Sequence, residues 1–138
     1  YGSYDILENR FIKLDISGGG LRKSDPAQWP WFLDKLSGTK FNNLFIFLSG
    51  PIDSFEDPLE AELLKDLLTQ LNKDTGKNIW VFYKGDKNES YTENGVRYLS
   101  TAGFDIEGLT PDTPDVVSYI HVTIDGSQIT YEFKPIIQ

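Results

Sequence analysis

Cysteine and methionine are both missing from this sequence, and histidine occurs once, as His121. Without cysteine, the chain has neither a disulfide framework nor thiolate chemistry. One histidine is too few for the His-rich sites that bind zinc, and we expect His121 to occupy an ordinary strand position. Because methionine is absent, the chain lacks its own start, which predicts a mature product or a fragment of a longer protein.

Long apolar runs and an excess of basic residues are missing as well. No run approaches the roughly 18 residues of a membrane-spanning helix, and no signal peptide is visible, so we expect no membrane insertion. The chain has 13 Lys and Arg against 21 Asp and Glu, a net charge of −8. Nucleic acids and anionic membranes need clustered basic residues, so neither is an expected partner. We expect a soluble, extracellular or cell-surface protein, because cysteine-free domains are common on bacterial surfaces.

What the sequence does contain is enough apolar material for one domain. It has 138 residues, of which 39% are hydrophobic and 14% aromatic. This composition excludes global disorder, and a chain of this length buries a core without the help of disulfides or metal ions. No repeat or linker divides it, so we expect a single domain over residues 1–138.

Two apolar runs organise the chain. Residues 44–48 and 79–83 are continuous apolar segments of the kind found in strands buried on both faces. Ligands of open α/β sheets bind beyond the carboxyl ends of the strands. The sequence therefore places candidate function in the loops that follow these strands, which contain Ser49 and Gly50 and, in the second loop, Gly85, Asp86 and Asn88.

Helix signals precede each of these strands. Asp25 followed by Pro26 and Gln28 is typical of a helix start, although Pro30 disturbs the first turn and moves the expected regular start to near Trp29. Gly38 is the expected stop of this helix. The second helix is expected to be capped by Asp57 and to end at Gly76, with Pro58 in its first position. Its apolar stripe is predicted to be Leu59, Leu63, Leu64, Leu67, Leu68 and Leu71, and its solvated face Glu60, Glu62, Lys65, Asp66, Gln70 and Lys73.

The remaining strands are expected around tight turns. Tyr4 and Ile6 suggest an edge strand before a turn at Glu8, and residues 17–20 read as a plain flexible glycine-rich turn. Asparagine–glycine and aspartate–glycine pairs predict two further hairpin turns. The expected strands are residues 10–16, 96–101, 116–124 and 128–134, with a loop at 102–115.

The expected fold class is α/β, a mixed sheet of about six or seven strands in the order β-α-β-α-β followed by antiparallel strands. Right-handed crossovers place both helices on one face of the sheet. The other face then lacks cover from this chain. This predicts association through an uncovered sheet face.

Several segments resemble the C-terminal half of the calcineurin-like metallophosphoesterase domain, a two-sheet sandwich flanked by helices. The resemblance covers nearly the whole chain. It is carried by residues 10–15, 24–32, 43–51, 78–88 and 95–103 and by the closing hairpin.

The departures from that family bear on activity. Such enzymes use two metal ions to activate water and bind phosphate, and the resemblance places late metal-binding histidines at Ser49 and within Gly85–Asp86–Lys87–Asn88. All three expected histidines are replaced, and the family's earlier Asp-x-His, Gly-Asp-x-x-Asp and Gly-Asn-His motifs do not occur. The resemblance therefore implies the fold, with vestigial ligand-loop positions at Ser49, Gly50, Gly85, Asp86 and Asn88 and no bound cofactor.

Other chemistries find weaker signals. Ser49 lacks a credible histidine base. Acidic residues cluster in two loops that offer oxygen ligands for Ca²⁺, although the second fails the EF-hand pattern at Tyr91 and Arg97. The three tryptophans offer stacking surfaces for sugars, but their spacing is more typical of core. The first acidic loop contains Asp53, Glu56 and Asp57, and the second contains Asp86, Asn88 and Glu89. The tryptophans are Trp29, Trp31 and Trp80.

Three functions follow from these observations. The first is a non-catalytic metallophosphoesterase-like domain with a structural or interaction role, whose partner is the N-terminal half of a parent chain or a second copy. The second is a fragment of a metal-dependent phosphoesterase whose remaining ligands lie outside this chain. The third is a cell-surface adhesion or carbohydrate-binding module.

Overall fold

The computed structural model describes residues 1–102 and 118–135. Its main element is a six-stranded sheet in the order β1-β2-β3-β4-β6-β5. The four central strands run parallel, and the two edge strands run antiparallel to their neighbours. The strands are β1 (Gly2–Ile6), β2 (Asn9–Lys13), β3 (Asn43–Leu48), β4 (Asn78–Lys84), β5 (Glu89–Glu93) and β6 (Val96–Thr101). This confirms the expected α/β class and the central position of the two apolar runs.

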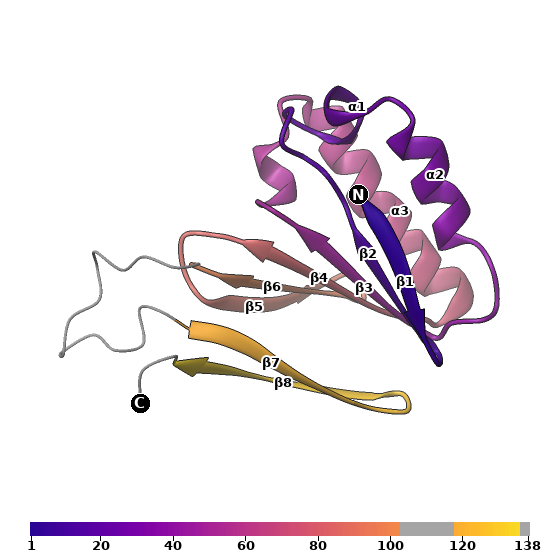
Figure 1. Ribbon diagram of the computed structural model, residues 1–138, viewed down its shortest axis with the longest axis vertical. Coiled ribbons are helices and arrows are strands. Elements are labelled where there is room, and N and C mark those ends of the chain that lie inside the picture. The colour runs from indigo at the N-terminus through magenta and orange to yellow at the C-terminus, as the bar shows by residue number, and fades with distance from the viewer. Residues whose placement is uncertain (103–117, 136–138) are drawn as a thin grey trace, which may run out of the picture.

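The helices of the described residues lie on one face of this sheet, as the handedness of the crossovers predicts (Figure 1). The helical layer contains α1 (Leu21–Ser24), α2 (Gln28–Leu36) and α3 (Pro58–Thr75), with a short 3₁₀ turn η1 (Ile52–Ser54) before α3. The bounds of α3 confirm the sequence prediction: the Asp57 carboxylate accepts from the Leu59 N–H at 3.0 Å, and Gly76 has φ 70°. Asp25 does not cap α2, because Ala27 precedes its first residue and the Asp25 side chain accepts from the Ala27 N–H.

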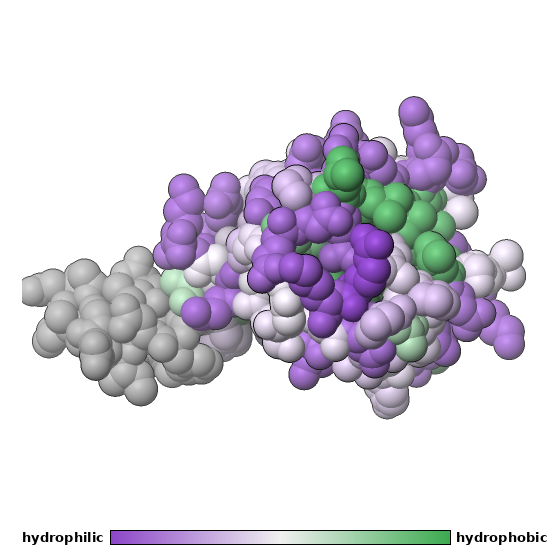
Figure 2. Space-filling model, turned by 90° about the horizontal axis from the view of Figure 1, so that it is seen from above, coloured by the Kyte–Doolittle hydropathy of each residue, from purple (hydrophilic) through white to green (hydrophobic). Residues whose placement is uncertain are grey.

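The leucine stripe predicted for α3 is only partly buried. Leu64 and Leu68 are fully buried against the sheet, whereas Leu59 and Leu63 are 74% and 54% exposed. Leu33 of α2 is exposed as well, and the view from above shows a green apolar area among hydrophilic side chains over the helices (Figure 2). The six leucines between residues 59 and 71 spread over a wider arc of the helix than the sheet covers, so part of the stripe faces outward.

The opposite face of the sheet is not bare, which corrects the expectation that this chain leaves it uncovered. The strands β7 (Ser118–Asp125) and β8 (Gln128–Pro135) form a separate two-stranded antiparallel sheet beneath it (Figure 1). The residues 116 and 117 predicted for this strand lie outside the described residues. The hairpin alternates cleanly: inward-facing residues are half-buried, and their neighbours, including His121, are exposed.

The hairpin packs on an aromatic face, the side of the six-stranded sheet that carries Phe11, Phe45, Phe47, Trp80, Phe82 and Leu99. Phe45, Trp80, Phe82 and Leu99 are buried there, and Ile120, Val122, Ile124, Ile129 and Tyr131 of the hairpin pack against them. The Trp80 and Tyr131 rings meet edge to face, with centroids 5.7 Å apart. Two sheets in contact through interleaved apolar side chains form a sandwich.

An asparagine ladder anchors the tip of the hairpin. Asn9, Asn43 and Asn78 lie in register on three neighbouring parallel strands. The Asn43 amide donates to Asn9 Oδ1 at 2.8 Å and to the Gly126 carbonyl at 2.9 Å, and the Asn78 amide donates to Asn43 Oδ1 at 2.9 Å. Asn43 therefore links the strands to each other and to the turn between β7 and β8.

The Asn43→Ala substitution should lower the free energy of unfolding by about 2–3 kcal/mol, because it removes a fully buried amide that makes three hydrogen bonds. Asn42→Ala is the matched control: its exposed side chain donates only to Glu8, at 3.0 Å, and its loss should cost under about 0.5 kcal/mol. Urea unfolding measures both. Equal effects of the two substitutions would contradict the anchoring role of the ladder.

Candidate functional site at the carboxyl ends of the strands

The two loops singled out by the sequence lie at one edge of the sheet. Ser49 and Gly50 follow β3, Gly85 and the residues after it follow β4, and these strands are neighbouring and parallel. The structure thus brings the predicted positions to the same edge. The surroundings of the two loops differ: the loop after β4 is held by hydrogen bonds, and the loop after β3 borders a cleft.

The loop after β4 is held by hydrogen bonds to β6 and β7. The Gly85 N–H donates to the Thr101 carbonyl at 2.8 Å, and the Ser100 hydroxyl donates to the Lys87 carbonyl at 2.9 Å. A Cβ on Gly85 would lie 3.1 Å from Ser100 Cβ, so the glycine permits a close approach of loop and strand.

Asn88 joins this loop to the hairpin. Its amide nitrogen donates to the Ser118 hydroxyl at 2.6 Å, and its amide oxygen accepts from the Ala102 N–H at 3.4 Å. One end of the side chain therefore holds the first residue of β7, and the other end holds the residue that follows β6. Asn88 acts in this structure as a connector between the two sheets.

Ser49 lines a different, partly polar cleft of about 470 Å³ at the ends of β2 and β3. The Asp15 carboxylate in this cleft accepts from the Ser17 N–H at 2.9 Å and from its hydroxyl at 2.7 Å. These hydrogen bonds hold the pKa of Asp15 below its usual value, so it remains a carboxylate. The residues around the cleft are Tyr1, Lys13, Leu14, Asp15, Ser17, Phe47, Leu48 and Ser49.

The acidic loop considered for Ca²⁺ has its side chains turned to separate partners. Asp53 pairs with Lys65 at 2.6 Å, Glu56 pairs with Lys23, and Asp57 caps α3. Across residues 1–102 and 118–135, no group of three or more His, Cys, Asp or Glu is arranged to hold a metal ion. The His121 side chain lies on the outer face of β7, opposite Glu132, and away from Ser49.

The tryptophans are engaged in packing, in agreement with their interpretation as core residues. Trp80 is 8% exposed and stacks on the aromatic face, and Trp29 and Trp31 pack against the helix-side core. A tyrosine cluster on that side is similarly inert: burial raises the pKa of Tyr98 to about 12, and burial together with a hydrogen bond to Tyr83 raises that of Tyr91. These phenols stay protonated near neutral pH and offer no base.

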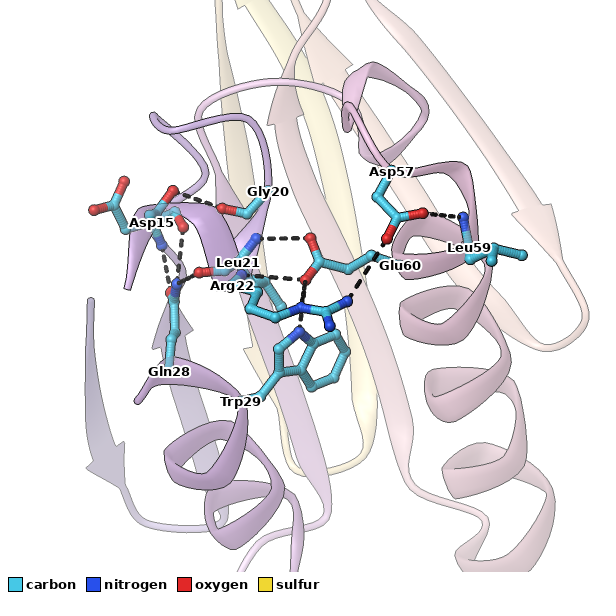
Figure 3. Close-up of polar contacts among 10 residues, drawn as sticks. Asp15, Gly20, Leu21, Arg22, Gln28, Trp29, Asp57, Leu59 and Glu60 are labelled. Atoms are coloured by element: carbon cyan, nitrogen blue, oxygen red, sulfur yellow. Dashed lines mark hydrogen bonds and ion pairs between the residues drawn. The ribbon is translucent and has the colours of Figure 1, made fainter. Parts of the chain in front are cut away.

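Sequence reasoning missed Glu60, a buried carboxylate with several hydrogen-bond partners. The apolar periodicity of α3 predicts a solvated position for it, yet it is 4% exposed. Its carboxylate accepts from the Leu21 N–H at 3.0 Å, the Arg22 N–H at 3.1 Å and the Trp29 indole N–H at 2.8 Å (Figure 3). Glu60 therefore joins all three helices.

The glycine-rich turn is built around this carboxylate, which corrects its interpretation as a plain flexible connection. A Cβ on Gly20 would lie 2.2 Å from Glu60 Oε1, so only glycine admits the carboxylate. Gln28, also fully buried, bridges the end of β2 to α1: it accepts from the Asp15 N–H at 2.7 Å and donates to the Leu21 carbonyl at 3.0 Å (Figure 3). The three consecutive glycines at residues 18–20, which permit a close approach of another group, were the signal available in the sequence.

An apolar groove lies between the aromatic face and β7. Its volume is about 490 Å³, and Phe11, Phe45, Phe47 and Phe82 form its floor. These rings stack at centroid distances of 5.1 to 6.4 Å. The wall consists of Thr101 from β6 and Ser118, Tyr119, Ile120, Val122 and Ile124 from β7. Phe47 also borders the Ser49 cleft, so the two hollows are adjacent.

The groove continues into exposed apolar surface on β1. Tyr4 and Ile6 pair with Phe11 and Asn9 and so share their face of the sheet. They are 65% and 47% exposed, and Phe47 is 39% exposed. We call Tyr4, Ile6, Phe11 and Phe47 the open part of the aromatic face.

No protein-family model, curated protein or solved structure matches this chain. The class that the structure itself defines is an α/β protein whose mixed sheet is covered by helices on one face and by a β-hairpin on the other. Among the residues that the structure describes, no helix is both long and apolar enough to cross a membrane.

The Glu60→Gln substitution should lower the free energy of unfolding by about 2 kcal/mol, because the amide replaces one charged acceptor oxygen with a donor that faces N–H groups. Glu62→Gln, on the exposed side of the same helix, should change it by less than about 0.5 kcal/mol. Urea unfolding monitored by circular dichroism distinguishes the two. A Glu60→Gln variant that is as stable as the wild type would contradict the conclusion that Glu60 joins the helices.

Proposed function

We propose that this chain is a non-catalytic, metallophosphoesterase-like domain whose role is to bind another polypeptide segment. The open part of the aromatic face is the observation that carries the proposal. Monomeric soluble proteins rarely expose large contiguous apolar patches, and those that do usually bind a partner there. Tyr4, Ile6 and Phe47 are all more than a third exposed on one continuous surface.

The loop after β4 supports the non-catalytic part of the proposal. The family resemblance places metal ligands in this loop, yet the amide of Asn88 is engaged at both ends, with Ser118 at the start of β7 and with Ala102 after β6. Lys87, which stands within the expected motif, would add a repelling charge beside a metal. The loop therefore serves to join the two sheets of the sandwich.

The proposed partner is the N-terminal half of a parent chain or a second copy of this chain. Either would cover the part of the aromatic face that β7 and β8 leave open. The proposed location is outside the cell or at its surface, a proposal that rests only on the frequency of cysteine-free domains on bacterial surfaces.

Sedimentation tests the interaction role. We expect the chain to associate with itself or with the separately produced N-terminal half, and Phe47→Lys to weaken that association at least tenfold by burying a charge in the contact. Leu59→Lys, on the helical side, is the control and should leave it unchanged. A strictly monomeric chain that binds neither partner would contradict the proposal.

Hydrolysis of p-nitrophenyl phosphate and its diester with added Mn²⁺ tests the alternative, a phosphoesterase fragment. We expect rates equal to those of buffer with Mn²⁺, for the wild type and for a variant with Asp86→Ala and Asn88→Ala. The alternative gains support only from the adjacency of the two loops at the carboxyl edge of the sheet. Turnover that disappears in the double variant would replace our proposal with an enzyme.

A further inference from the structure

We propose that the open part of the aromatic face binds an extended polypeptide strand, which adds to the free edge of β7. The inference rests on the proposed function and specifies its partner: a single strand with apolar residues at alternate positions, from a polypeptide other than a second copy of this chain. Three features of the structure favour this partner: the edges of the two sheets, the width of the uncovered surface and the groove between the sheets.

The β7 strand has the edge that is best suited to pairing. Among the described residues it pairs only with β8, so its other edge carries backbone N–H and C=O groups without strand partners. Its register with β8 is continuous over eight residues, without a bulge. Natural edge strands are usually short, charged or interrupted by proline or a bulge, which prevents further pairing.

The other edge strands carry such protection. The β5 strand begins and ends with glutamate, β1 has only five residues and includes Asp5, and β8 ends in Lys134 and Pro135. The β7 strand has no lysine, arginine or proline, its one acidic residue, Asp125, stands at its last position, and its apolar residues alternate with polar ones. Among the strands that the structure describes, the long edge with the least protection therefore borders the apolar groove.

The uncovered surface of the sheet is wide enough to accept additional strands. The six-stranded sheet faces a hairpin of only two strands. Neighbouring strands lie about 4.8 Å apart, so the open part over β1 to β3 has room for about two more. The interface between the hairpin and the aromatic face continues directly into this space, because β7 forms the wall of the groove and Phe11 and Phe47 lie on its floor.

A strand in this position satisfies both surfaces at once. Its backbone pairs with β7, while every second side chain points down onto the phenylalanine floor, which is the mode of strand addition to sheet edges. The strands of a second folded copy are less suitable. The inner face of its β7 already packs on its own aromatic face, and its β5 is polar.

Binding of a ten-residue, fluorescein-labelled peptide with valine at odd positions and threonine or lysine at even positions tests the inference. We expect a rise in fluorescence anisotropy and slower amide hydrogen exchange in residues 118–125. The Phe47→Lys variant should bind at least tenfold more weakly, and Leu59→Lys should bind as the wild type does. A second peptide, N-methylated at alternate residues to block pairing, should bind at least tenfold more weakly to the unchanged protein.

The outcomes separate this inference from the proposed function. If the N-methylated peptide binds equally well, or exchange in residues 118–125 does not change, strand addition is wrong while the face remains a binding surface. A dimer that forms in sedimentation and is lost in Phe47→Lys assigns the face to a second copy and also overturns the inference. No binding of either peptide at millimolar concentration, with no association in sedimentation, overturns both proposals.

Discussion

The structure depends on one constraint, which is that a sheet of parallel strands with apolar side chains on both sides must be covered on both faces. On one face, α2 and α3 supply that cover and bury Leu64 and Leu68. On the other, β7 and β8 cover Trp80 and Phe82 but leave Phe47 and the side chains of β1 open. The incomplete cover is what directs the functional interpretation toward binding.

Each layer is fixed to the sheet by polar groups at defined positions. On the helical side, Glu60 accepts three hydrogen bonds from α1 and α2, and Gly20 makes room for it. On the hairpin side, the asparagine ladder holds the turn of the hairpin, and Asn88 holds its start. Apolar contact between layers is not directional, so these hydrogen bonds set where each layer lies.

The sequence predicts the parts of this fold that depend on local signals. The cap of Asp57, the stop at Gly76 and the positions of the carboxyl-end loops were predictable, because propensity and apolar periodicity determine them, whereas α1 and β5 were not expected. The burial of Glu60 was not, since its partners lie 31 to 39 residues away and periodicity alone places it on a polar face. The contact of the hairpin with the aromatic face was not predictable either, because it depends on how two sheets stack.

The interpretation of the candidate site also depends on contacts between distant segments, which local sequence signals do not predict. Ser49, Gly85 and Asn88 could be placed at one edge from strand order, but only the contacts of Asn88 reveal that it connects the two sheets.

The central claim is that a partner covers the open part of the aromatic face. Hydroxyl-radical footprinting of Phe47 and Tyr4 tests this claim most directly, in the isolated chain and in the protein from its native source. The account predicts strong oxidation of both in the isolated chain and protection in the native protein, with Leu59 equally oxidised in each. Equal oxidation of Phe47 and Tyr4 in the two samples would contradict it.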